Sequence, residues 1–144
     1  MKTPAGSESF ELERNQTFTV DADIVWDRLR SVSGQALPES LGTPSTSGEG
    51  SERTVSLAMD GLGAFVQRLR SCNDADRELV LEMVESGGLP VDSYESSWAV
   101  LGDASGGTVH VRAALTTTGG HGALVSGMFR DALDLGLRRL CREP

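Results

Sequence analysis

The sequence predicts an α+β fold in which one antiparallel sheet packs on a long C-terminal helix. Three observations support this prediction: strand-type alternation of apolar and polar residues, turn-forming residues between those segments, and a C-terminal segment with helical apolar spacing. The 144 residues are about enough for one domain. We expect residues 1–9, which are small and polar, to form a flexible lead-in, and residues 10–144 to form the domain.

The domain is predicted to begin with a strand and a short helix. Residues 10–20 carry apolar side chains at one parity, which is typical of a strand with one solvent-exposed face. Asp21 and Asp23 then provide an acidic N-cap before an amphipathic apolar pattern. We expect this helix to end near Ser33 and Gly34, where the pattern stops.

The middle of the chain changes from loop to strand. Residues 34–52 combine Gly, Pro, Ser and Thr with few apolar residues, which predicts a short helical turn followed by a loop. Five strand-like runs follow, at residues 53–59, 64–72, 78–85, 94–101 and 108–117. Turn-forming residues separate most of them, including the Gly-rich segment 102–107. With the strand at residues 10–20, these runs make six strands, which should pair as antiparallel neighbours.

The last predicted element is the long helix. Apolar residues recur at three- and four-residue spacings from Leu124 to Leu140. Arg138 and Arg139 lie near its C-terminal end, where the helix dipole favours positive charge. Since one helix covers only one face of a sheet, a sheet curled around it would leave a hollow between the two.

Charge and cysteine content exclude several function classes. The chain has 13 basic and 21 acidic residues and a net charge of -8, which opposes binding to phosphate backbones, so we expect no nucleic-acid partner. No apolar run approaches the ~20 residues that span a bilayer, so we expect no membrane span. Cys72 and Cys141 lie far apart without ligand spacing, and no secretory or transit segment is recognisable, so we expect a cytoplasmic protein without a metal site.

Several short segments between Phe10 and Leu140 match one known superfamily in their order and spacing. They are Asp23–Trp26, Arg53–Val55, Val66–Leu69, Asn73–Asp74 with Arg77, Ser93–Ser96 and Thr108–His110. The ordered set resembles the START-like (SRPBCC) superfamily with the helix-grip fold, and within it the polyketide cyclase/dehydrase and lipid-transport type. The resemblance implies a curved antiparallel sheet of six or seven strands wrapped around the C-terminal helix, with one or two short helices after the first strand.

The sequence departs from the family pattern at informative positions. Gln67 stands where many relatives carry Glu, so a neutral amide replaces a carboxylate that acid/base chemistry would use. A Trp-x-Pro motif is missing near residues 36–38, and His110 replaces a common Trp. Residues 60–64 and 86–91 correspond to the ligand-gating loops of the plant abscisic-acid receptors, which share the pattern more distantly. These two segments are either lids or ordinary turns.

The resemblance implies a hydrophobic, carbonyl-bearing small molecule bound in an internal cavity. Bacterial relatives of this type cyclise, aromatise or dehydrate such molecules in specialised, polyketide-type metabolism, and no metal or organic cofactor is implied. The alternative is a non-catalytic carrier or sensor of a lipid or other apolar metabolite, which Gln67 favours. A weaker third hypothesis is a chaperone-interacting relative whose client is a protein. The chain would be a monomer or a homodimer.

If the resemblance holds, alternation along the strands predicts which side chains face the cavity. The predicted ligand-binding residues are Phe65, Gln67, Leu69, Val84, Leu89, Ser96, Trp98, Arg112, Met128, Ala132 and Gly136. The predicted catalytic residues are Glu82, Tyr94 and His110. They make a mostly apolar lining with a few polar groups, which is the usual composition of a small-molecule pocket.

Each catalytic candidate has a structural alternative. Glu82 lies among apolar residues, where a raised pKa would suit a general base, but if the strand faces the other way it pairs with a surface Arg. Tyr94, the only tyrosine, either donates to a ligand or lies in the core with its hydroxyl satisfied. His110 and Arg112 share the polar parity of their strand, so they polarise a carbonyl only if that parity faces inward.

Overall fold

The computed structural model describes residues 7–30, 42–47, 54–59, 61 and 63–142. Its elements are β1 (Glu8–Phe18), α1 (Ala22–Arg30), β2 (Gly42–Ser47), β3 (Thr54–Met59), β4 (Gly63–Asn73), β5 (Glu78–Glu85), β6 (Val91–Asp103), β7 (Gly106–Thr117) and α2 (Gly122–Cys141). The strands form one antiparallel sheet in the order β1-β7-β6-β5-β4-β3-β2. This arrangement is the predicted helix-grip α+β fold.

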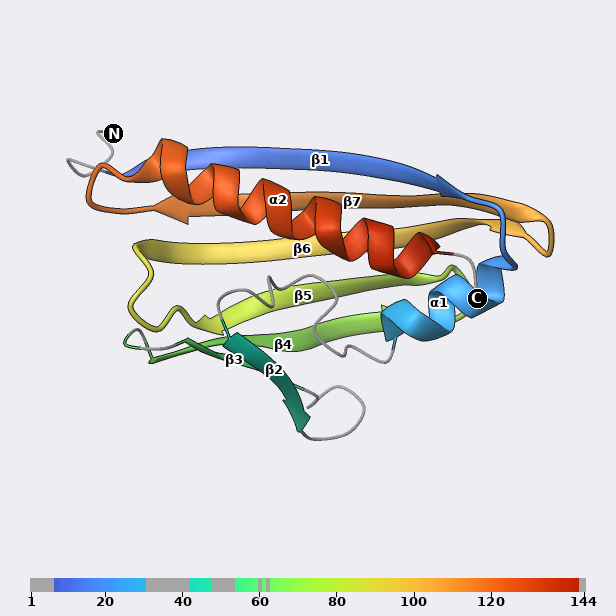
Figure 1. Ribbon diagram of the computed structural model, residues 1–144, viewed down its shortest axis with the longest axis horizontal. Helices are drawn as coiled ribbons and strands as arrows, with labels where there is room; N and C mark the ends of the chain where they lie inside the picture. The colour runs from blue at the N-terminus through green and yellow to red at the C-terminus, as the bar shows by residue number, and fades with distance from the viewer. Residues whose placement is uncertain (1–6, 31–41, 48–53, 60, 62, 143–144) are drawn as a thin grey trace.

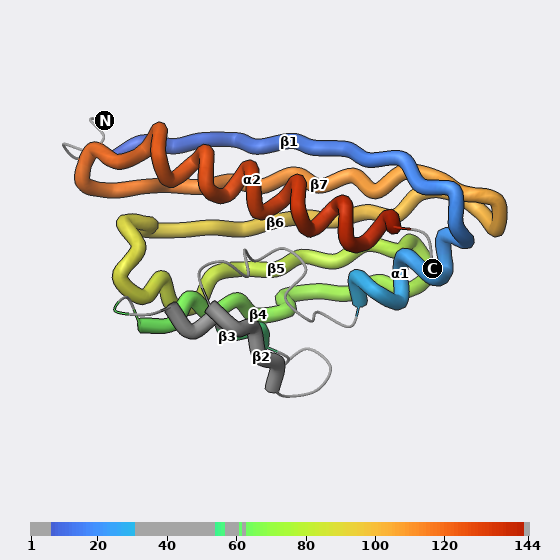
Figure 2. The backbone as a smooth tube through the Cα atoms, viewed as in Figure 1, coloured from blue at the N-terminus to red at the C-terminus, as the bar shows by residue number. Residues whose placement is uncertain are grey.

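Both helices lie on the same face of the sheet, which we call the inner face (Figure 1). Helix α2 crosses it diagonally from the β1 side, and the C-terminal end of α2 lies beside α1 (Figure 2). Arg14 on β1 holds α2 through a bidentate pair with Asp134, with Nε–Oδ1 and Nη2–Oδ2 distances of 2.7 Å. Arg28 on α1 donates to the carbonyl oxygens of Leu140 and Arg142, where the helix dipole concentrates negative charge.

The core lies between the inner face and the helices because each strand alternates its side chains between the two faces. On β7, Val109, Val111, Ala113 and Leu115 are all buried, whereas the intervening Arg112 is exposed. Helix α2 contributes its apolar stripe to the same core. The opposite face of the sheet, which we call the outer face, carries the polar parity.

Helix α1 begins as predicted and is anchored to a distant turn. Asp21 caps it, since its Oδ1 accepts the backbone N–H of Asp23 at 2.9 Å. The indole N–H of Trp26 donates to Oδ1 of Asp74 in the β4–β5 turn at 2.9 Å. Trp26 therefore buries its ring while its only polar atom stays satisfied. Among the described residues α1 ends at Arg30, and the predicted end near residues 33–34 lies outside them.

Residues 42–47 differ from the prediction. They belong to the segment 34–52, which was expected to be a helical turn and loop, but they form β2 and pair with β3, with Pro44 opposite Leu57. Strand β2 lies at the edge of the sheet, where a proline is tolerated because one side of the strand needs no ladder partner. The remainder of that segment, residues 34–41 and 48–52, lies outside the described residues.

Strand β1 also begins earlier than predicted. Glu8 and Ser9 belong to the expected flexible lead-in, but they pair with Thr117 and Thr116 of β7. The long β6–β7 hairpin supplies a partner along the whole of β1, and this pairing orders residues that carry no strand signal of their own. Residues 1–6 lie outside the described part of the chain. Within that part, neither helix has the length and hydropathy needed to cross a membrane.

Candidate functional site

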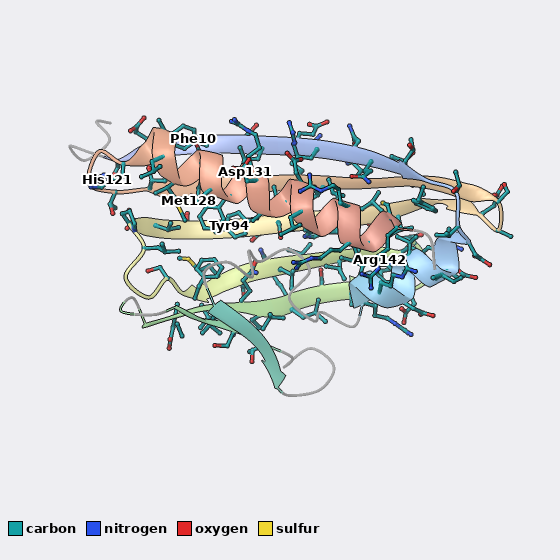
Figure 3. The ribbon with its side chains drawn as sticks, in the orientation of Figure 1. Phe10, Tyr94, His121, Met128, Asp131 and Arg142 are labelled. Carbon is teal, nitrogen blue, oxygen red and sulfur yellow. The ribbon has the colours of Figure 1, made fainter. Side chains whose placement is uncertain are left out.

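Three aromatic side chains from separate elements meet on the inner face. The ring of Tyr94 on β6 stacks on Phe129 of α2, with a centroid separation of 4.6 Å and an interplanar angle of 18°. Phe65 of β4 lies 5.6 Å from Phe129 and 6.3 Å from Tyr94, with tilted rings. In the view of Figure 3, Tyr94 and Met128 lie along the edge of α2 nearer β5, and Asp131 lies along the edge nearer β1. These contacts hold α2 against β4 and β6.

Gln67 brings an unusual polar group to this apolar region. Its exposed fraction is 1%, and its Oε1 atom accepts no hydrogen bond from any described residue. A buried carbonyl oxygen without a donor costs about 1–3 kcal/mol. The Oε1 atom of Gln67 therefore either lowers the stability of the fold with no benefit, or accepts a hydrogen bond from a ligand that binds there.

The sheet register places this acceptor level with Tyr94. Gln67 pairs with Met83, and the β5–β6 ladder ends at the pair Glu82–Glu95; continuing that register by one residue places Met83 and Tyr94 in the same row. Gln67 and Tyr94 are therefore two strands apart, or about 10 Å. Met83 between them is half-buried and packs against the core.

Ser96 on β6 is a second buried polar residue, and unlike Gln67 its side-chain oxygen has a hydrogen-bond partner. Ser96 is buried, and its Oγ accepts the indole N–H of Trp98 at 2.9 Å. Burial raises the pKa of Tyr94 well above its ordinary value, and a hydrogen bond with Ser96 offsets only part of that rise. The phenol of Tyr94 is thus a stable proton donor at neutral pH. We refer to these residues as the inner-face cluster: Phe65, Gln67, Tyr94, Ser96, Trp98 and Phe129.

Glu82 and Val84 do not belong to this cluster, so the prediction that they face inward is wrong. Glu82 lies on the outer face in an ion pair with Arg68, the alternative considered above, and Val84 is 50% exposed. Alternation along β5 instead directs Leu81 and Met83 to the inner face. A general base at Glu82 is therefore incompatible with a ligand on that face.

His110 and Arg112 also lie on the outer face. The predicted role for them inside a cavity required that they face inward, so that prediction is wrong. His110 Nε2 lies 3.1 Å from Glu13 Oε1, and Arg112 Nη2 lies 3.4 Å from Glu13 Oε2. The pKa of Glu13 is lowered, chiefly by the hydrogen bond with His110 and next by the positive charge of Arg112. The buried valines on either side of His110 give the physical reason, because they take the inner parity.

Most other predicted residues lie on the inner side of the molecule. Leu69 and Trp98 are buried on their strands, and Ala132 is buried on α2. Gly136 is also buried on α2, whereas Met128 is half-buried. Their burial agrees with the predicted facing, while their contact with a ligand stays a prediction.

Two members of the site region were missed by sequence reasoning. Met83 shares the parity of Leu79 and Leu81, and this alternation was available in the sequence. Phe129 lies four residues after Val125 and four before Leu133, a spacing that marks the buried stripe of a helix. Neither position signals by itself that it stands beside Tyr94 and Gln67.

The two predicted lid segments approach each other. A Cβ atom on Gly63 would lie 3.7 Å from the Cα atom of Gly87, so the β4 start and the β5–β6 loop are in contact. Both glycines have positive φ, +79° and +60°, a conformation that other residues rarely adopt. Leu89 in the second segment is half-buried and packs against the core. Within the described residues, no group of His, Cys, Asp and Glu side chains is arranged to hold a metal ion.

Comparisons with known proteins place the chain in a family. The family described as "Polyketide cyclase / dehydrase and lipid transport" matches residues 9–143. The chain belongs to this family, which lies within the START-like superfamily that its motifs resemble. Among curated proteins, none matches this chain.

Solved structures share the fold at low sequence identity. Norcoclaurine synthase from Thalictrum flavum has 12% identity and a TM-score of 0.66, with 96% of this chain and 90% of that chain covered. The same synthase in complex with dopamine and hydroxybenzaldehyde has 14% identity and a TM-score of 0.66, with coverages of 94% and 87%. The Zhui aromatase/cyclase from Streptomyces sp. R1128 has 21% identity and a TM-score of 0.60, with coverages of 92% and 87%.

Proposed function

We propose that the protein binds a hydrophobic, carbonyl-bearing small molecule between α2 and strands β4–β6, and promotes its cyclisation, aromatisation or dehydration. The observation that carries this proposal is the buried Oε1 of Gln67, which has no hydrogen-bond partner among the described residues and belongs to a residue level with Tyr94 in the sheet. A ligand with a donor at one end and a carbonyl at the other satisfies both groups. Membership of a family described by polyketide cyclase, dehydrase and lipid-transport activity supports this reaction class.

In this proposal Tyr94 is the group that touches the reacting atoms. Its phenol donates to a ligand carbonyl oxygen, so negative charge that develops there during carbon–carbon bond formation is stabilised. The aromatic rings of Phe65 and Phe129 hold the ligand folded, which brings the attacking carbon close to that carbonyl. The enol form of the substrate supplies the attacking carbon and its O–H proton passes to solvent, while the carbonyl oxygen takes a proton from Tyr94, which solvent replaces. The new hydroxyl then leaves as water together with a proton from the neighbouring carbon, which completes a dehydrative ring closure.

Two of the compared structures support this ligand class. The synthase complex contains dopamine and hydroxybenzaldehyde, one of which is an aromatic carbonyl compound. The Zhui protein is an aromatase/cyclase.

A non-catalytic carrier is the second candidate, and a specific observation favours it. Gln67 is neutral, and Glu82 and Glu95, the carboxylates next to Met83 and Tyr94 along β5 and β6, lie on the outer face, so neither can act as a base beside Tyr94. A carrier needs only the apolar surface and the two hydrogen-bonding groups. Without a carboxylate to accept a proton, the enzyme hypothesis requires a substrate carbon acidic enough to lose its proton to solvent.

A linear phenyl triketone tests the two candidates. Its aldol closure with loss of one water gives phenylresorcinol, whereas attack by an enol oxygen gives a pyranone. An enzyme raises the yield of phenylresorcinol above the buffer control, and Tyr94→Phe lowers it by about 100-fold, as expected for loss of an acid catalyst. Glu82→Gln, on the outer face, is the matched control and leaves the yield unchanged.

Three outcomes separate the hypotheses. An increased phenylresorcinol yield that depends on Tyr94 supports catalysis. Saturable binding of the triketone without a change in product ratio supports the carrier. Absence of binding, measured by tryptophan fluorescence, contradicts both, because Trp98 lies within the inner-face cluster.

A further inference from the structure

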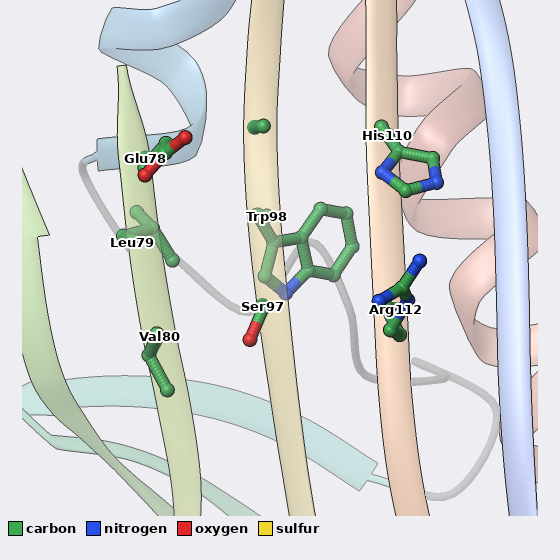
Figure 4. Close-up of a pocket in the computed structure, with 8 residues that line it drawn as sticks. Glu78, Leu79, Val80, Ser97, Trp98, His110 and Arg112 are labelled. Carbon is green, nitrogen blue, oxygen red and sulfur yellow. The ribbon is translucent and has the colours of Figure 1, made fainter. Parts of the chain in front are cut away.

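A groove opens on the outer face of the sheet, opposite the inner-face cluster, and Trp98 is the one residue of that cluster that also lines it (Figure 4). It has a volume of about 290 Å³. Glu78, Leu79 and Val80 of β5 line one side, His110 and Arg112 of β7 line the other, and Ser97, Trp98 and Ala99 of β6 lie between them. Sheet surfaces are usually covered by long side chains, so a hollow in the middle of one needs an explanation.

The register of the strands explains it. Ser97 pairs with Val80 on one side and Arg112 on the other, while Ala99 pairs with Glu78 and His110. Two short side chains on β6 thus lie between longer ones on both neighbouring strands. The groove consequently runs along β6, and its walls are about 10 Å apart at the backbone.

The polar groups of the groove are less completely paired than the rest of the outer face. On the same face, Arg68 pairs with Glu82 and Arg70 with Glu95. Glu78, by contrast, forms no ion pair with any described residue, and the guanidinium of Arg112 has one contact, at 3.4 Å, through Nη2 alone. The remaining Arg112 donors and the Glu78 carboxylate therefore stay available on opposite walls.

We propose that this groove binds a small zwitterion that carries an amine and a carboxylate on a short carbon chain. The carboxylate binds to Arg112, whose planar guanidinium matches it in geometry and charge. The amine binds to Glu78 on the β5 wall. The connecting carbons lie over Ala99 and Val80, and Ser97 offers a hydroxyl to the carboxylate. The volume is near the lower end of the range for ligand pockets, which limits the ligand to this small size.

The test is an NMR titration of the ¹⁵N-labelled protein with γ-aminobutyrate. We expect saturable shifts at the amides of Ser97, Ala99 and Arg112, with a dissociation constant of about 1 mM, the affinity that a few weak polar contacts supply. Butyrate and butylamine, which each carry one of the two charges, should bind at least about fivefold more weakly, the factor that loss of one exposed ion pair removes.

Two pairs of variants locate the site. Glu78→Gln and Arg112→Gln should each weaken binding about fivefold. Ala99→Leu should abolish it by filling the floor, whereas Ala114→Leu, at an exposed position of β7 outside the groove, should leave it unchanged. Absence of saturable shifts, binding that survives Ala99→Leu, or equal affinity for butyrate would each overturn the proposal. The phenyl triketone, the probe of the inner face, should leave these amides unmoved, so the two proposals fail separately.

Discussion

Replacement of Gln67 by leucine is predicted to stabilise the protein, although the residue is buried in the core. The Oε1 atom has no donor within the described part of the chain, and an unsatisfied buried carbonyl costs about 1–3 kcal/mol. Leucine removes that cost and adds apolar surface to a site that is 1% exposed. Since the shapes differ slightly, we expect a net gain of about 1 kcal/mol, or about 3 °C in Tm for a domain of this size.

Ser96→Ala is the matched control with the opposite sign. Ser96 is also a buried polar residue on the inner face, but its Oγ accepts the indole N–H of Trp98. Its removal leaves that N–H without a partner, so the free energy of unfolding should fall by about 1–2 kcal/mol. Urea denaturation at neutral pH measures both variants, with equal m-values showing that the two-state transition is retained.

Ligand binding should respond in the opposite direction to stability. Hydroxynaphthaldehyde offers a hydroxyl to Gln67 and a carbonyl to Tyr94, and Gln67→Leu should weaken it about tenfold, the equivalent of one hydrogen bond. Naphthaldehyde lacks the hydroxyl and should bind the variant as well as the parent. A variant that loses more than about 1 kcal/mol of stability while binding both ligands normally would refute this reasoning, because the amide would then serve the fold.

Three further predictions follow from the geometry. Burial raises the pKa of Tyr94 above its ordinary 10.0, so above that pH the folded protein keeps a proton that the unfolded chain loses. The free energy of unfolding should therefore fall as the pH rises above 10.0. In Tyr94→Phe, the urea midpoint should fall less over the same pH range. Burial likewise raises the pKa of the Cys141 thiol from 9.0 to about 11. A thiol reagent at about pH 8 should therefore label the exposed Cys72 quickly and Cys141 only after unfolding. Equal labelling rates for the two cysteines would contradict the burial of Cys141. Asp134→Asn should break the bidentate pair with Arg14 and cost up to about 1 kcal/mol, since both side chains are partly exposed, and a double-mutant cycle with Arg14→Gln measures the coupling.

Local pattern was sufficient for much of the fold. The Asp21 cap and the α2 stripe depend on residues close in sequence, and the structure contains both. On β4, Phe65, Gln67 and Leu69 are buried while Arg68 and Arg70 are exposed, so the inward parity could be predicted. These features are set by capping chemistry and by side-chain period.

Long-range pairing was needed for the rest. Strand β5 has apolar residues at both parities, Leu79, Leu81 and Met83 at one and Val80 and Val84 at the other, so its sequence favoured the observed facing without excluding the opposite one. The exposed partner of Glu82 is Arg68, which is set by the β4–β5 register. Strand β2 has no apolar alternation and is a strand because β3 supplies its hydrogen bonds.

The most direct test of the central proposal is methyl NMR of the methionines during titration with hydroxynaphthaldehyde. Met83 lies in the row between Gln67 and Tyr94, and in the view of Figure 3 Met128 lies along the same edge of α2 as Tyr94. We predict saturable shifts of both ε-methyl signals, which weaken with Gln67→Leu. Unchanged Met83 and Met128 signals, with shifts confined to the outer groove around Ser97 and Ala99, would contradict binding on the inner face.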